Sequence, residues 1–134
     1  MSREEINEKL TLFLKENGYR KNKLNWYKQK DELTIVFSIQ RSQYSKEQWY
    51  YNFGIGIDAL VSGKISVISK CHIIERLENR LAGRMLSPDD LSRAIMHWES
   101  KYGDISELRY KAIENKLPKM TTKQAISYLT TVRT

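Results

Sequence analysis

A chain of 134 residues with one cysteine cannot build an intramolecular disulfide framework, and 40% hydrophobic residues with only 6 Gly and 2 Pro exclude a largely disordered chain. No apolar run approaches the ~18 residues of a membrane-spanning helix, and the first residues are polar instead of a hydrophobic leader. We therefore expect a single cytoplasmic domain over residues 1–134, whose net charge of +7 favours acidic partners.

The N-terminal residues predict a helix over about residues 3–17. Ser2 and Glu5 have the spacing of a capping box, and apolar side chains then recur with helical spacing. Gly18 is typical of the residue that follows the end of a helix.

Alternating apolar and polar residues predict strands over residues 19–27, 33–39 and 49–58, with a turn at residues 30–32. The predicted core face of the last two strands carries Leu33, Ile35, Phe37, Ile39, Trp49, Tyr51, Phe53, Ile55 and Ile57. Val36 is assigned to the opposite, outward face, together with Gly54 and Gly56. Glycine weakens a strand unless something must approach its backbone, so we interpret the two glycines as a strand irregularity or a packing point.

Residues 63–84 are more ambiguous. Apolar residues on both parities of residues 63–74 favour a fourth strand with both faces partly covered, followed by a loop or helical turn over residues 75–84. The spacing of Ile73, Leu77 and Leu81 also fits a helix from about residue 71 onward.

The C-terminal third predicts three helices. Ser87 is a helix N-cap, Pro88 follows it at the first helical position, and Gly103 ends the helix. Two more helices are expected over residues 105–116 and 122–132, the last with Thr121 and Gln124 as a capping box. The order indicates an α+β fold, with an antiparallel sheet of about four strands preceded by one helix and followed by about three.

Four short pieces of sequence carry a family resemblance. They are residues 17–21 (Asn-Gly-Tyr-Arg-Lys), 26–27 (Trp-Tyr), 39–42 (Ile-Gln-Arg-Ser) and 50–55 (Tyr-Tyr-Asn-Phe-Gly-Ile). Over about residues 5–80 the chain resembles the bacterial family catalogued as domain of unknown function 4304. The resemblance implies a small bacterial α+β protein and transfers no activity, cofactor or catalytic residue. Small proteins of this kind often accompany toxin or mobile-element genes, so an immunity or inhibitor role is an expectation.

The sequence gives little support for catalysis. Cys71 and His72 are neighbours, so on a strand they face opposite sides and cannot form a dyad; Cys71 is interpreted as a small buried residue. No Cys or carboxylate lies at ligand spacing from His72 or His97, so no metal or cofactor is predicted. A hydrolase or nuclease, the third functional reading, requires a cleft with clustered acids or a His–acid pair.

The preferred reading is a non-enzymatic protein-binding module that uses polar and aromatic residues of the sheet. The candidate partner-binding residues are Tyr27, Gln40, Ser42, Tyr50 and Asn52. If strand register aligns Gln40, Ser42 and Asn52, they form a polar strip. The structural alternative is that these side chains satisfy backbone groups at turns and edges.

A basic nucleic-acid-binding domain is the alternative function. Its candidate residues are Arg20, Lys21, Lys23, Lys28 and Lys30 in one segment, and Arg76, Arg80 and Arg84 in another. The three arginines share a face only if their segment is helical. The structural alternative is a solvated surface that keeps the chain soluble.

Overall fold

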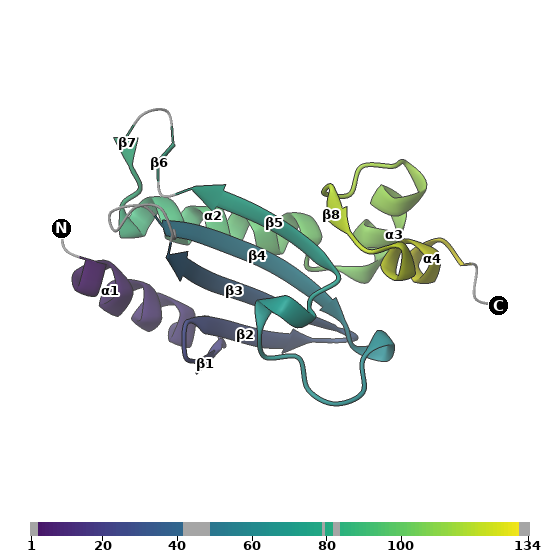
Figure 1. Ribbon diagram of the computed structural model, residues 1–134, viewed down its shortest axis with the longest axis horizontal. Coiled ribbons are helices and arrows are strands. Elements are labelled where there is room, and N and C mark those ends of the chain that lie inside the picture. Colours follow the sequence, from purple (N-terminus) through teal and green to yellow (C-terminus); the bar gives the residue numbers. More distant parts are fainter. Residues whose placement is uncertain (1–2, 42–48, 79, 82–83, 132–134) are drawn as a thin grey trace.

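The structure is built around an antiparallel sheet (Figure 1). The computed structural model describes residues 3–41, 49–78, 80–81 and 84–131. In these residues the sheet has six strands, in the spatial order β1 (Arg20–Asn22), β2 (Asn25–Lys30), β3 (Leu33–Arg41), β4 (Trp49–Ile57), β5 (Ile73–Glu78) and β8 (Met120–Thr121). A second sheet pairs β6 (Arg80–Leu81) with β7 (Arg84–Met85). The helices are α1 (Arg3–Glu16), α2 (Pro88–Tyr102), α3 (Ile105–Ile113) and α4 (Lys123–Thr130).

Helices α1 and α2 cover one face of the sheet, where the core lies. Leu10 and Leu14 of α1 and Leu91 of α2 are fully buried. The predicted core face of β3 and β4 is confirmed, and Phe37 and Phe53 meet across the two strands at a centroid separation of 5.5 Å. The predicted alternation therefore placed the main hydrophobic face correctly. No helix in the described part of the chain has the length and apolar character that crossing a membrane requires.

Most of the predicted helix ends agree with the structure. Gly18 follows α1 with a φ of +89°, a conformation that glycine adopts without strain. The Ser87 hydroxyl accepts a hydrogen bond from the Asp90 amide in a complete capping box, and Gly103 caps the C-terminus of α2. The N-cap of α4 is Thr122 instead of Thr121, because Thr121 belongs to β8 and the Thr122 hydroxyl accepts from Ala125 N. Ser2 lies outside the described residues.

The prediction of one strand over residues 19–27 was wrong in detail. Two strands, β1 and β2, form a hairpin that turns at Lys23, where φ is +56°. The turn at residues 30–32 is confirmed, with Asp31 at a φ of +55°. The sheet is therefore wider than the four strands expected.

The strand predicted over residues 63–74 begins later than expected: residues 63–72 form no strand, and β5 begins at Ile73. The chain between β4 and β5 crosses the outer face of the sheet and contains two 3-10 turns, Asp58–Leu60 and Ile68–Lys70. Its apolar residues pack on β3, so Val36, assigned to an outward face, is completely buried with Ile65 and Cys71. An added Cβ on Gly54 would lie 2.5 Å from Ile68 Cδ1, and one on Gly56 would lie 2.5 Å from Ile65 Cδ1. Of the two interpretations of these glycines, a strand irregularity or a packing point, the structure supports the packing point.

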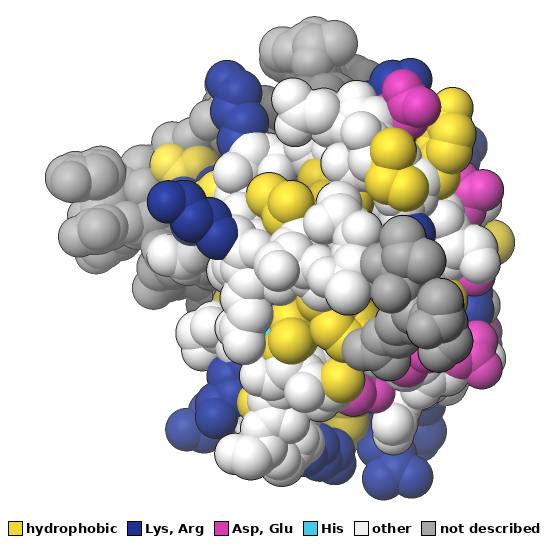
Figure 2. All heavy atoms as spheres, turned by 90° about the vertical axis from the view of Figure 1, so that its right-hand side faces the viewer, with side chains coloured by type: hydrophobic (Ala, Val, Ile, Leu, Met, Phe, Trp, Pro, Cys, Tyr) yellow, Lys and Arg dark blue, Asp and Glu magenta, His cyan; other side chains and the backbone are white. Residues whose placement is uncertain are grey.

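The described part of residues 75–84 forms strands instead of the expected loop or helical turn. Strand β5 continues to Glu78, and β6 and β7 follow it. The end of the molecule opposite to these short strands is formed by β8, α3 and α4 (Figure 1). There Ile113, Tyr110 and Met120 are more than half exposed. Figure 2 shows separate groups of hydrophobic side chains on this end, with Lys, Arg, Asp and Glu mostly toward the edges of the view.

Candidate functional site

A hydrogen-bonded group of side chains lies on the outer face of the sheet, beside the loop that crosses it. We call this group the polar patch; its members are Ser38, Gln40, Tyr50, Asn52 and Arg76. Strand register brings them together, because Ser38 pairs with Asn52, Gln40 pairs with Tyr50, and Asn52 pairs with Arg76 across β3, β4 and β5. Directly opposite residues project to the same face, so the five side chains share one surface.

Arg76 is the centre of the polar patch. Its Nε donates to Asn52 Oδ1 at 3.1 Å, and its NH2 donates to Gln40 Oε1 at 3.0 Å. The guanidinium also lies 4.8 Å from the centroid of the Tyr50 ring, within the range of a cation–π contact. Asn52 Nδ2 completes the network by donating to Ser38 Oγ at 3.2 Å and to Gln40 Oε1 at 3.3 Å.

Members of the polar patch differ in their exposure. Asn52 and Ser38 are 3% and 4% exposed, so they form its base, whereas Gln40 and Arg76 reach solvent. A buried amide costs free energy unless it is hydrogen-bonded, and here both ends of Asn52 are satisfied. The polar patch therefore has a buried base, formed by Ser38 and Asn52, and an accessible layer, formed by Gln40 and Arg76.

The structure joins three of the predicted partner-binding residues and separates a fourth. Gln40, Tyr50 and Asn52 are in the polar patch, and Ser42 lies outside the described residues. Tyr27 occupies the same face but pairs with Val36, in the part of the sheet that the crossing loop covers. Sequence reasoning missed Arg76 as a member, because it placed no strand over residues 75–78.

Tyr27 lies close to two cationic side chains, Lys64 and Arg20. Lys64 Nζ lies 4.5 Å from the centroid of its ring. A hydrogen bond from Lys64 is the main cause that lowers the pKa of the Tyr27 phenol, and the charges of Lys64 and Arg20 act in the same direction. These side chains line a hollow of about 350 Å³. The arrangement favours negative charge near Tyr27.

The basic residues of the β1–β2 hairpin lie on both faces of the sheet, although Arg20 and Lys28 both line the hollow beside Tyr27. Arg20 pairs with Tyr27 on the outer face, whereas Lys21 pairs with Trp26 on the helix-covered face and lies 5.4 Å from its ring centroid. Lys28 makes an ion pair of 2.5 Å with Glu99 of α2. The proposed stripe of three arginines is not helical, and the side chains of Arg80 and Arg84 lie outside the described residues.

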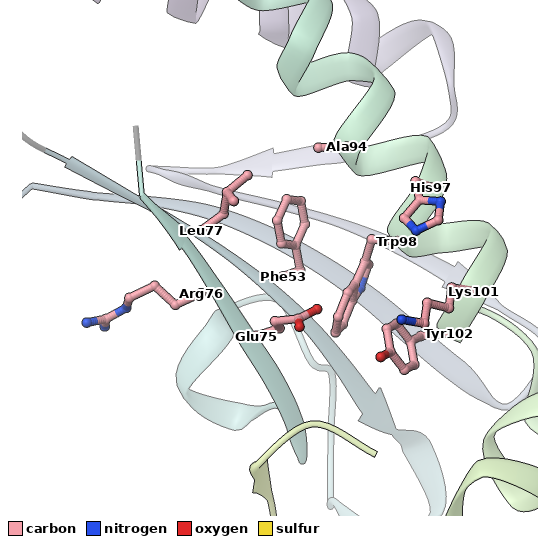
Figure 3. A pocket seen from close by; sticks show the side chains of 9 residues that line it. All are labelled: Phe53, Glu75, Arg76, Leu77, Ala94, His97, Trp98, Lys101 and Tyr102. Atoms are coloured by element: carbon pink, nitrogen blue, oxygen red, sulfur yellow. The ribbon is translucent and has the colours of Figure 1, made fainter. Parts of the chain in front are cut away.

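A hollow of about 300 Å³ opens between β5 and α2 on the helix-covered face (Figure 3). Its lining includes Phe53, Leu77 and Trp98, together with Glu75, His97 and Lys101. Figure 3 shows Glu75 and Leu77 directed toward α2, and Arg76 directed away from the hollow. The Trp98 indole N–H is buried and has no hydrogen-bond partner in the described part of the chain. Sequence reasoning missed this hollow, which depends on how α2 crosses the sheet.

Cys71 and His72 are both buried, and their contacts are those of side chains that stabilise the fold. Burial raises the pKa of the Cys71 thiol to about 12, so it is a protonated, unreactive side chain at neutral pH. The His72 ring accepts a hydrogen bond from Ile57 N at Nδ1, at 3.0 Å. Among the described residues, no group of three or more His, Cys, Asp or Glu side chains is placed to hold a metal ion.

The His72 environment predicts a loss of stability in mild acid. Burial lowers the pKa of His72, so the unfolded chain, in which His titrates near 6.5, takes up the proton first as the pH falls. The stabilisation is therefore complete above about pH 6.5 and declines below it. We expect His72→Asn, whose Oδ1 is placed to accept from Ile57 N, to flatten the dependence of the urea midpoint between about pH 7.5 and about pH 5.

The exposed second histidine gives the matched control for this prediction. His97→Asn is expected to keep the acid dependence of the unmodified chain, because His97 lies at the surface of α2 and makes no hydrogen bond among the described residues. A flattened profile for His97→Asn and an unchanged one for His72→Asn would contradict the assignment.

These features define an α+β protein with an antiparallel sheet, in which helices cover one face and part of the other face is left open as a polar surface. The chain belongs to the family described as Domain of unknown function (DUF4304), whose model matches residues 10–130. The match continues through α3 and α4, beyond the residues that carried the resemblance. The chain has no significant match among curated proteins or among solved structures.

Proposed function

We propose that the protein is a non-enzymatic binding module that docks a protein partner on the polar patch. The observation that carries the proposal is the exposed Arg76, which is held by Gln40 and Asn52 and lies over Tyr50. Arg and Tyr are enriched among residues that dominate binding energy at protein interfaces. Because hydrogen bonds already fix these side chains, a partner immobilises little additional rotamer freedom when it binds.

Charge supports an acidic partner surface. The chain carries a net charge of +7, and the accessible layer of the polar patch presents one guanidinium. Opposite charge on the partner increases the rate of encounter and fixes the docking register. The specific form that we propose is an immunity- or inhibitor-type protein of a bacterial or mobile-element system, which covers an acidic surface of a toxin or enzyme.

The other two readings have less geometric support. Nucleic-acid binding needs several cations along one track. Arg20, Lys28 and Lys64 meet around the hollow beside Tyr27, but Lys28 is paired with Glu99 and Lys21 lies on the helix-covered face. A hydrolase needs a base that another group orients, and no hydrogen bond joins Glu75 to His97 among the described residues. In the part of the chain that the structure describes, the polar patch combines a hydrogen-bond network with accessible side chains.

Two alanine substitutions separate the accessible layer from the base of the polar patch. We expect Gln40→Ala to leave the melting temperature nearly unchanged and to weaken partner binding about tenfold, because Gln40 is exposed. Asn52→Ala should lower the free energy of unfolding by about 1–3 kcal/mol, because Arg76 and Ser38 lose a buried partner. The measurements are thermal unfolding of each variant and the Kd for the partner that co-purifies from the native host.

Gln29→Ala is the matched control, because Gln29 is an exposed glutamine on the same face of the sheet but hydrogen-bonds to Asp58, away from the polar patch. Its Kd should equal that of the unmodified chain. Full partner affinity in Gln40→Ala, or recovery of the unmodified chain without a stoichiometric partner after crosslinking at physiological salt, would count against the proposal.

A further inference from the structure

Most of strand β5 is an open edge of the sheet. Strand β8 pairs only with Ile73 and Ile74, and in the described part of the chain no strand lies beside the rest of β5 on that side (Figure 1). The Thr122 amide donates to the His72 carbonyl at 2.9 Å across this edge. Main-chain groups alternate in direction along an antiparallel strand, so the N–H and C=O of Ile74 and of Arg76 point to the same side. At Arg76 both groups therefore point outward from the sheet.

We propose that the partner binds by adding an extended segment to this edge, antiparallel to β5 and opposite Arg76. The inference rests on the proposed function and specifies how the partner is held. Strand addition supplies affinity through main-chain hydrogen bonds, and side chains at alternate positions supply specificity. Arg76 connects the two surfaces, because its side chain belongs to the polar patch while its backbone faces the open edge.

The two sides of β5 define the side chains that the segment carries. The residue opposite Arg76 projects to the outer face, where the guanidinium favours Asp or Glu. The residues before and after it project toward α2, into the hollow of about 300 Å³ walled by Phe53, Leu77 and Trp98 (Figure 3). The walls formed by Phe53, Leu77 and Trp98 favour large apolar or aromatic side chains. The fitting pattern is apolar–acidic–apolar.

Proline at position 76 tests the main-chain contribution. Arg76→Pro removes the N–H that faces the edge and leaves the hydrogen bonds between β5 and β4 in place, because proline is tolerated on an edge strand. Arg76→Ala is the matched control, since it removes the same side chain and keeps the N–H. The probe is a fluorescein-labelled peptide, Thr-Val-Thr-Phe-Glu-Phe, which ends opposite Glu75 and therefore leaves Ile73 and Ile74 to β8. Its Kd is measured by fluorescence anisotropy. We expect Arg76→Pro to bind it about tenfold more weakly than Arg76→Ala.

Modified peptides test the same contact on the unmodified chain and decide the result if Arg76→Pro does not fold. Methylation of the Glu main-chain nitrogen removes the N–H that faces Arg76 and should abolish binding. Methylation of the following Phe nitrogen alters an N–H that points away and should leave the Kd within about twofold. Equal effects of the two methyl groups, or no binding of the parent peptide below about 1 mM, would overturn strand addition.

The test also separates this inference from the proposed function. Strand addition fails if proline and alanine at position 76 bind the peptide equally, whereas the polar patch fails if Gln40→Ala keeps full affinity for the natural partner. A concentration-dependent dimer of the free chain that Arg76→Pro abolishes, seen by sedimentation, would assign the edge to a second copy of this chain and overturn the partner segment.

Discussion

Gly54→Val is expected to lower the free energy of unfolding by about 3 kcal/mol, at the upper end of the usual cost of overpacking. The first added carbon would lie 2.5 Å from Ile68 Cδ1 and 2.9 Å from Cys71 Cβ. Strand β4 is central in the sheet, so the clash is relieved only if the crossing loop moves away from the outer face. The measurement is the unfolding free energy from urea titration of the variant and the unmodified chain.

A double-mutant cycle supplies the control for this prediction. Ile68→Ala removes one of the atoms that a side chain at Gly54 would meet, so the double variant should lose less stability than the sum of the two single variants. Part of the cost should remain, because Cys71 is unchanged. Strict additivity would show that the glycine is not required by the close approach of the loop.

Trp98→Ala is expected to cost about 3–5 kcal/mol, a large part of the 5–15 kcal/mol that stabilises a typical domain. The Trp98 ring is 4% exposed and lies 5.5 Å from the Phe53 centroid and 4.2 Å from the Tyr102 centroid. Because Trp98 is a wall of the hollow between β5 and α2, removing its ring enlarges this hollow and takes packing contacts from Phe53 and Tyr102. Chemical denaturation monitored by circular dichroism gives the loss directly.

Trp98→Phe is the matched control. Phenylalanine keeps an aromatic ring against Phe53 and removes the N–H that has no partner in the described residues, so the expected loss is below about 2 kcal/mol. Equal losses for alanine and phenylalanine would indicate that the indole N–H contributes more than the packed ring, in contradiction to this account.

The elements that could be predicted from sequence are those with local chemical signals. Ser87, Pro88 and Gly103 marked α2 because capping depends on residues close in the chain. The strands β3 and β4 were predictable because one face is consistently apolar. Gly54 signalled a close approach because glycine in a central strand has a packing cost.

The elements that were missed depend on contacts distant in sequence. The apolar residues Ile65, Ile68 and Cys71 resembled part of a strand, but their spacing fits a loop that packs on Gly54 and Gly56. Periodicity cannot distinguish these cases, because either arrangement buries the same side chains. The fourth strand was therefore predicted too early in the chain. As a result, the pairing of Arg76 with Asn52 was not foreseen.

The candidate site was accordingly predicted in part. Gln40, Tyr50 and Asn52 were placed on one face because the parity of two neighbouring strands is local information. Arg76 joins them through a third strand, whose register no sequence signal fixed. The hollow beside α2 depends on how a helix crosses the sheet, which is a property of the packed core alone.

The central claim is that a protein partner docks on the polar patch and the adjoining edge of β5. Amide chemical shifts of the isotopically labelled chain, recorded while the natural partner is added, test it most directly. The account predicts the largest changes at Gln40, Asn52 and Arg76 and along β5. Largest changes in the β1–β2 hairpin around Arg20 and Lys21, or at the α3 and α4 end of the molecule, with Gln40 and Arg76 unaffected, would contradict it.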